Sequence, residues 1–124
     1  MQEYLQKKHY FEERPWGSFE EFTKNEVSTV KIITVKPGQA LSLQRHKNRD
    51  EFWRVLSGQG FVTVENERFV TKVSAEYFIP KGILHRIEGD KTDGATAPLI
   101  ILEISTGNFD ENDIERIEDQ YGRT

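Results

Sequence analysis

Residues 51–73 read EFWRVLSGQGFVTVENERFVTKV, and this stretch decides the fold class. It holds three short runs rich in β-branched and aromatic residues, 51–57, 61–64 and 68–73, and such residues favour extended strands. The turn-forming residues Gly58-Gln59-Gly60 and Glu65-Asn66-Glu67 separate these runs. The pattern predicts β-strands, with a tight hairpin at residues 65–67.

The same pattern continues on both sides of this stretch. Further short apolar runs are present at 29–35, 76–79, 85–88 and 99–104. Pro37-Gly38 ends the first of them, and Pro80-Lys81-Gly82 follows the second. Several short strands, spaced by about 8–12 residues and separated by turn residues, predict an all-β barrel or sandwich.

The two ends of the chain have a different character. Residues 1–13 are polar with scattered aromatic side chains, so we expect a short helix or an extended N-terminal arm. Near the other end, Ile114, Ile117 and Tyr121 have helical spacing and predict a short C-terminal helix. With 124 residues we expect one domain over 1–124, with the barrel at 14–105 and a C-terminal segment at 106–124.

Composition excludes several classes of function. The chain has no cysteine, so disulfides, thiol nucleophiles and cysteine-ligated metal sites are excluded. The formal net charge of −4 argues against a nucleic-acid partner, which needs a basic face. The longest apolar run, Leu99–Leu102, is far shorter than the roughly 20 residues of a membrane span. We therefore expect no membrane partner, and we expect a cytoplasmic location.

Four polar side chains stand out as candidate metal ligands. Gln44 and His46 share one face of an extended segment, because side chains alternate along a strand. Glu51 begins the next strand, and His85 follows a rigid Pro-Gly turn that can direct its imidazole into the same barrel. This set of nitrogen and oxygen donors suits zinc, cobalt, manganese, iron or nickel. The alternative is that these side chains only hydrogen-bond one another inside the barrel.

The spacing of these residues resembles a known family. Gly38-(x)5-Gln44-x-His46-(x)4-Glu51-(x)6-Gly58 is similar to the first cupin motif, and Pro80-x-Gly82-x-x-His85 is similar to the second. The segments RPWGSFE (14–20), VKPG (35–38), LSLQRH (41–46), IPKG (79–82) and DIERIEDQYGR (113–123) resemble type II mannose-6-phosphate isomerases. In larger members of that family, the cupin domain follows a mannose-1-phosphate guanylyltransferase domain. The resemblance implies an all-β cupin fold, the double-stranded β-helix, over nearly the whole chain.

The resemblance also implies an activity, the interconversion of mannose 6-phosphate and fructose 6-phosphate for GDP-mannose biosynthesis. A cation held by Gln44, His46, Glu51 and His85 would stabilise the enediolate that forms in the reaction. Either Glu51 or a hydroxide on the cation would move the proton between C1 and C2. Candidate cations for the phosphate are Arg14, Lys31, Arg45, Lys81, Arg86 and Arg123.

Two more residues have expected roles, and two depart from the family. Arg123, on a C-terminal segment folded over the barrel mouth, is a candidate catalytic residue, and Trp53 is expected to line the cavity and bind substrate. Asn48 and Phe52 stand where the family often has histidine.

The alternative functions are a non-catalytic cupin that binds a sugar phosphate or sugar nucleotide, and a cupin with other metal chemistry.

The aromatic and apolar residues of the N-terminal arm bear on the oligomeric state. Tyr4, Leu5, Tyr10 and Phe11 lie within or next to otherwise polar sequence. Such side chains can pack on a neighbouring copy, so we expect a homodimer.

Overall fold

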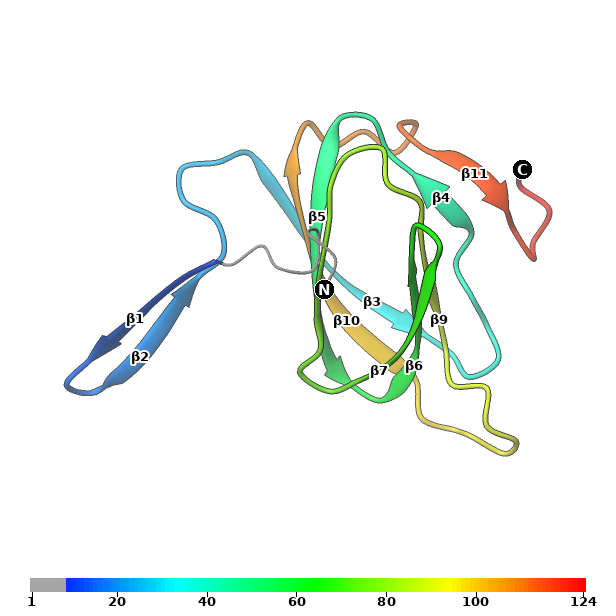
Figure 1. Ribbon diagram of the computed structural model, residues 1–124, viewed down its shortest axis with the longest axis horizontal. Coiled ribbons are helices and arrows are strands. Elements are labelled where there is room, and N and C mark those ends of the chain that lie inside the picture. The colour runs from blue at the N-terminus through cyan, green and yellow to red at the C-terminus, as the bar shows by residue number, and fades with distance from the viewer. Residues whose placement is uncertain (1–8) are drawn as a thin grey trace.

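Two antiparallel sheets and a separate hairpin make up the computed structural model, which describes residues 9–124. The four-stranded sheet has the order β3 (Ser28–Val35), β10 (Leu99–Gly107), β5 (Arg49–Ser57) and β8 (Glu76–Ile79). The five-stranded sheet has the order β11 (Glu115–Glu118), β4 (Leu43–Arg45), β9 (His85–Glu88), β6 (Gln59–Val64) and β7 (Glu67–Lys72). The hairpin consists of β1 (Tyr10–Arg14) and β2 (Gly17–Glu21). Figure 1 shows the two sheets side by side, with the hairpin projecting from them.

The hydrophobic core lies between the two sheets. Trp53, Val55 and Ile101 come from the four-stranded sheet, and Val62 and Ile87 come from the five-stranded sheet. All five side chains are almost fully buried. Burying these apolar surfaces stabilises the barrel by about 25 cal/mol per Å² removed from water.

One end of this interior is polar. Along β5 the inward-facing residues are Arg49, Glu51, Trp53 and Val55, so the strand begins with charged side chains and continues with apolar ones. On the neighbouring strand β10, the inward-facing residue Glu103 lies opposite Trp53. Charged groups that are taken out of water need partners, so this end of the barrel is where chemistry is expected.

The strands predicted from the apolar runs are confirmed, including the hairpin between β6 and β7. The predicted C-terminal helix is wrong, because residues 115–118 form β11, which pairs with β4. Only Ile114 of the three helically spaced residues is half-buried, while Ile117 and Tyr121 are exposed, so no apolar helix face meets the core. The free edge of β4 provides backbone partners that a helix in this segment would leave unpaired. Residues 9–124 contain no helix, and so none long and apolar enough to cross a membrane.

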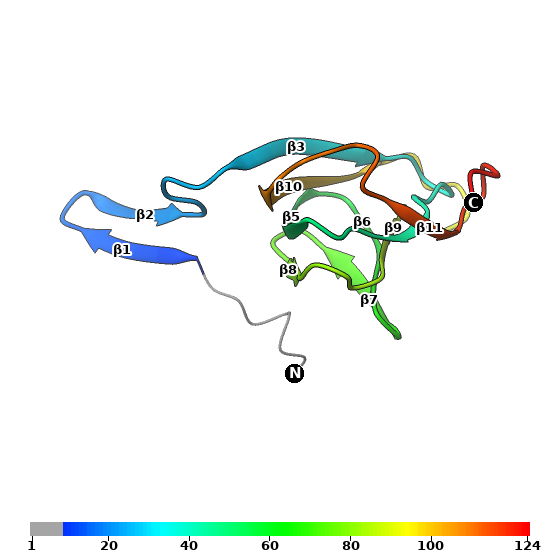
Figure 2. The same ribbon diagram turned by 90° about the horizontal axis from the view of Figure 1, so that it is seen from above.

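The N-terminal segment is described from His9 onwards. From Tyr10 the residues expected to form an arm or a short helix form β1, which pairs with β2. Both views show this hairpin pointing away from the barrel, on the side of the four-stranded sheet (Figures 1 and 2). Tyr4 and Leu5, which were expected to contact a neighbouring copy, lie outside the described residues.

Candidate metal centre

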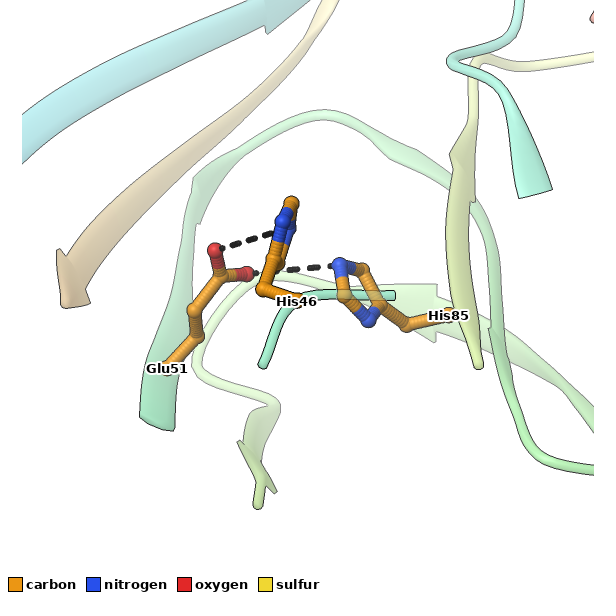
Figure 3. Close-up of side chains that lie close together, drawn as sticks. All are labelled: His46, Glu51 and His85. Atoms are coloured by element: carbon orange, nitrogen blue, oxygen red, sulfur yellow. Dashed lines mark ion pairs between the residues drawn. The ribbon is translucent and has the colours of Figure 1, made fainter. Parts of the chain in front are cut away.

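Three of the four predicted metal ligands meet at the polar end of the barrel. The Nε2 atom of His46 lies 3.4 Å from one carboxylate oxygen of Glu51, and the Nε2 atom of His85 lies 3.6 Å from the other. All three side chains are buried. Figure 3 shows the two imidazole rings directed at the carboxylate. The donor atoms lie within 4.8 Å of one another, which is close enough for one cation to contact all three.

The local sequence explains how the two histidines come together. His46 follows β4 and His85 begins β9, and these strands are neighbours in the five-stranded sheet. Gly82, in the turn before β9, has a φ of 81°, a conformation that is unfavourable for residues with a Cβ. In this conformation its N–H donates to the carbonyl of His46 at 2.8 Å, which ties the turn to the end of β4.

Backbone carbonyls fix the tautomer of both histidines. The Nδ1 atom of His46 donates to the carbonyl of Asp113 at 2.7 Å, and Nδ1 of His85 donates to the carbonyl of Ile83 at 2.9 Å. Because a carbonyl can only accept, each Nδ1 carries the proton and each Nε2 presents a lone pair towards Glu51. Among the described residues, Nε2 of His85 is buried with no hydrogen-bond partner. A buried lone pair without a partner is what a metal ligand requires.

The protonation states suit a metal site as well. Burial lowers the pKa of both His46 and His85, which favours neutral imidazoles. Burial alone would raise the pKa of Glu51, but the neighbouring basic groups His85, His46 and Arg49 lower it, and with neutral imidazoles the charged hydrogen bond from Arg49 keeps the carboxylate ionised. Neutral imidazoles and an ionised carboxylate are the forms that bind a cation.

Two tight contacts hold the carboxylate of Glu51. The indole Nε1 of Trp53 donates to one oxygen and Nε of Arg49 donates to the other, each at 3.1 Å. Nη2 of Arg49 also lies 3.1 Å from Nε2 of His46. Trp53 is therefore buried beneath the site as a positioning residue for Glu51.

Sequence reasoning missed two buried charged residues of this site, Arg49 and Glu103. Burial, and then the charge and hydrogen bond of the adjacent Glu51, raise the pKa of Glu103 to about 8. At neutral pH Glu103 is therefore protonated and donates to Glu51. Alternation was the available signal, since Arg49 shares the face of Glu51 on β5, and Glu103 shares the face of Leu99 and Ile101 on β10.

Gln44, the fourth predicted ligand, lies at the side of the cluster. It is half-buried and directly opposite His85 in the pairing of β4 with β9, so both side chains share one face of the sheet. Its Oε1 accepts a hydrogen bond from the hydroxyl of Ser42 at 2.8 Å. Its role as a metal ligand stays a prediction.

The C-terminal segment lies over the mouth of the barrel beside this cluster. The carboxylate of Asp113 accepts the backbone N–H groups of Lys47 and Asn48 at 2.8 and 2.9 Å. An open groove of about 730 Å³ lies beside them. Arg45, His46, Lys47, Asn48 and Asp113 are among the residues that line it. The groove therefore meets the cluster at His46, while Glu51 and His85 are not part of its lining.

The predicted substrate-binding residues are dispersed. Lys31 lies over the ring of Phe109 at 4.2 Å, and Arg49 lies over the same ring at 4.4 Å, near the mouth. Arg86 alternates with the inward-facing His85 and pairs with Glu118. The remaining three lie in the hairpin, in the turn before β9 and near the C-terminus, namely Arg14, Lys81 and Arg123.

The structure also shows where the two residues that depart from the family motif lie. Asn48 lines the groove beside His46. Phe52 lies on the opposite face of β5 from Glu51, where its ring packs against Phe22. A residue at position 52 therefore faces away from the metal cluster.

The chain is similar to several characterised bacterial proteins. It is 42% identical over 112 residues to the alginate biosynthesis protein AlgA of Pseudomonas aeruginosa, covering 90% of this chain and 22% of that protein. It is 42% identical over 118 residues to a mannose-1-phosphate guanylyltransferase of Escherichia coli, covering 94% of this chain and 24% of that protein. The chain thus spans about a quarter of the length of these relatives.

Comparison with solved structures identifies the fold. A Klebsiella pneumoniae protein with a double-stranded β-helix domain matches with a TM-score of 0.61, covering 77% of this chain and 78% of that chain. At 20% identity this likeness concerns the fold alone. The two facing sheets are therefore the double-stranded β-helix of the cupins, as the motifs predicted.

A family model covers nearly the whole chain. The model described as "Mannose-6-phosphate isomerase C-terminal" matches residues 2–119, which include both predicted cupin motifs. The chain therefore belongs to the mannose-6-phosphate isomerase C-terminal family.

Proposed function

We propose that the chain is a metal-dependent isomerase that interconverts mannose 6-phosphate and fructose 6-phosphate. The observation that carries the proposal is the pair of imidazole lone pairs on His46 and His85, both directed at the ionised carboxylate of Glu51. The family supports a hexose phosphate as substrate, and a relative named mannose-1-phosphate guanylyltransferase supports a place in the supply of GDP-mannose.

The donor set fits a divalent cation. His46, His85 and Glu51 would hold it, with Gln44 as a fourth ligand from the adjacent strand. Zinc, cobalt, manganese, iron and nickel all accept such nitrogen and oxygen ligands. When bound, the cation would supply Lewis-acid stabilisation of the negative charge that develops on the substrate oxygens.

The chain's own residues would orient the reacting groups. Arg49 and Trp53 fix the two oxygens of Glu51, and Glu103 donates a further hydrogen bond to the same carboxylate. Held in this way, Glu51 would move a proton between C1 and C2 of the sugar through the oxygen that it does not commit to the cation. The low pKa of Glu51 keeps it in the basic form that this step needs.

The phosphate of the substrate requires cations outside the metal cluster. Arg45 and Lys47 line the groove that leads to His46, so they are the first candidates. Lys31 lies near the mouth, beside Phe109. Arg123 is paired with Asp119 at 2.8 Å, and its catalytic role requires it to leave that partner. We expect the reaction to take place in the cytoplasm.

The decisive experiment combines metal titration with a turnover assay. Metal-stripped protein is titrated calorimetrically with zinc, cobalt and manganese, and fructose 6-phosphate formation from mannose 6-phosphate is followed with and without each ion. We expect one ion per chain and turnover that depends on it. His85→Ala and Glu51→Gln should lose both metal binding and turnover.

His9→Ala tests the other group of residues that could hold an ion, because His9 lies with Glu20 and Glu76 near the hairpin, outside the cluster. It should retain one ion per chain and full turnover. Metal binding without turnover would favour the alternative function, a non-catalytic cupin that binds a sugar phosphate. Unchanged metal stoichiometry in both His46→Ala and His85→Ala would refute the site.

A further inference from the structure

One arginine of the described chain lacks an acidic partner. Residues 9–124 contain eight arginines, and ion pairs with glutamate or aspartate hold seven of them, namely Arg14, Arg45, Arg49, Arg54, Arg68, Arg86 and Arg123. Arg116, on β11, is the exception within this range, because it is half-buried and its Nε is buried with no hydrogen-bond partner. A guanidinium is always charged, and a buried charged N–H group is costly without an acceptor. A bound anion would supply that acceptor.

The strand register places Arg116 on the same face of the five-stranded sheet as the metal cluster. Arg116 lies directly opposite Gln44, and Gln44 lies directly opposite His85. Residues that are directly opposite one another share a face of the sheet, so these three form one row. Figure 1 shows β11 beside β4 at the edge of the sheet. Neighbouring strands lie about 4.8 Å apart, so the backbone of Arg116 is about 10 Å from that of His85.

The acidic neighbours of Arg116 on β11 are directed away from this face. Glu115 alternates with Arg116 along the strand and pairs with Arg45. Glu118 pairs with Arg86 on the outer face. The register of β11 shifts between Arg116 and Glu118, and such a bulge changes the direction of the side chains that follow it. The guanidinium of Arg116 therefore keeps donors that its own strand does not neutralise.

We propose that Arg116 binds the phosphate group of the substrate, at a subsite that lies two strands away from His85. A guanidinium can donate two parallel hydrogen bonds to a phosphate. In mannose 6-phosphate the phosphate lies at the far end of the sugar from C1 and C2, so it needs a cation at a distance from the metal cluster. Arg45 would have to leave Glu115 to bind the phosphate, whereas Arg116 has no such partner among the described residues. This subsite rests on the proposed function, which supplies the substrate.

The test measures phosphate recognition separately from metal chemistry. Phosphorus NMR follows the titration of mannose 6-phosphate into the full chain, first free of metal and then loaded with zinc. Arg116→Gln removes the charge and should raise the dissociation constant about tenfold or more, as the loss of a charge-assisted hydrogen bond does. Arg116→Lys keeps the charge but loses the planar fork, so its dissociation constant should lie between those of wild type and Arg116→Gln.

Arg68→Gln is the matched control. Arg68 is on β7 of the same sheet, where it pairs with Glu88, so this variant should bind mannose 6-phosphate as tightly as wild type does. Equal affinities in Arg116→Gln and Arg68→Gln would overturn the proposal. So would a loss of affinity in Arg45→Gln that Arg116→Gln does not share, or a wild-type chain that does not bind mannose 6-phosphate.

Zinc titration of the same variants distinguishes this subsite from the metal centre. Arg116→Gln should still bind one zinc ion per chain, because its side chain is not among the metal ligands. A wild-type chain that binds mannose 6-phosphate but no zinc would refute the metal centre alone, since the metal-free titration still measures the contribution of Arg116. Loss of zinc binding in Arg116→Gln together with Arg116→Lys would show a structural role for Arg116 and overturn the proposal.

Discussion

Nη2 of Arg49 lies 3.1 Å from Nε2 of His46, the nitrogen whose lone pair faces Glu51. The same guanidinium donates to Glu51 through Nε, also at 3.1 Å. Arg49 is buried, and Nη1 donates to the carbonyl of Asp110 at 3.3 Å. A positive charge thus already contacts two of the groups that would bind a cation.

Removal of this charge should strengthen metal binding. In Arg49→Met the lone pair of His46 no longer has to give up a charge-assisted hydrogen bond, which is worth about 1.5–3 kcal/mol. We expect zinc to bind about tenfold more tightly or better by calorimetric titration, since about 1.4 kcal/mol corresponds to tenfold. Arg54→Met, which changes a surface arginine paired with Glu20, should leave the affinity unchanged. Weaker zinc binding in Arg49→Met would mean that Arg49 mainly positions Glu51.

The side chain of Asp113 should influence metal affinity without touching the metal. Its carboxylate orders the backbone of Lys47 and Asn48, and its carbonyl accepts from His46. Asp113→Ala should weaken zinc binding by about tenfold, in the range seen when outer-shell partners of a ligand are changed. Asp119→Ala changes a carboxylate that pairs with Arg123 and does not line the groove, and it provides the control. Equal zinc affinities in the two variants would show that the side chain of Asp113 has no influence on the metal centre.

Glu103 should make the stability of the metal-free protein depend on pH. Its pKa is about 8 in the folded state, above the ordinary value of 4.5, because of burial and the neighbouring Glu51. Between these two values the unfolded chain has lost the proton that the folded chain keeps. The free energy of unfolding therefore falls as pH rises from about 4.5 to about 8.

Glu103→Gln removes this titration and keeps a hydrogen-bond donor for Glu51. The stability of the variant relative to wild type should rise steadily with pH across the same window, as measured by denaturant unfolding with a chelator present. A difference that stays constant with pH would show that Glu103 is ionised in the folded protein.

Gly60 should not tolerate alanine. A Cβ at this position would lie 2.2 Å from the carbonyl oxygen of Glu88 and 3.0 Å from a methyl carbon of Leu99. Gly60→Ala should cost about 2 kcal/mol or more in the free energy of unfolding, as overpacked cores do. Gly94 has a φ of 79° but open space around it, so Gly94→Ala should cost only about 1 kcal/mol. Equal costs for the two variants would contradict the close approach of β6 to β9.

The long strands could be predicted from sequence because their signal is local. β5 contains Phe52, Trp53 and Val55, and β10 contains Ile100, Ile101 and Ile104, all residue types that favour strands. β4 and β11 are three and four residues long and exist through their pairing with each other, which no local pattern records. The predicted C-terminal helix failed for this reason.

The candidate metal centre, like the fold, could be predicted only in part from the sequence. The motif spacing indicated His46, Glu51 and His85, which the fold brings together. It gave no sign of Arg49 and Glu103, whose importance depends on strand alternation and on the register between β5 and β10. Positions of surface cations such as Arg86 depend on which face of a strand each one occupies, so sequence distance from a ligand is a poor guide to them.

His85 begins one strand of the five-stranded sheet and His46 follows the adjacent strand, whereas Glu51 belongs to the sheet that faces it. A cation bound by all three would cross-link the two layers of a chain that has no cysteine for a disulfide. Loading with zinc should therefore raise the melting temperature of the barrel as a whole, and chelation should let its two halves separate more easily.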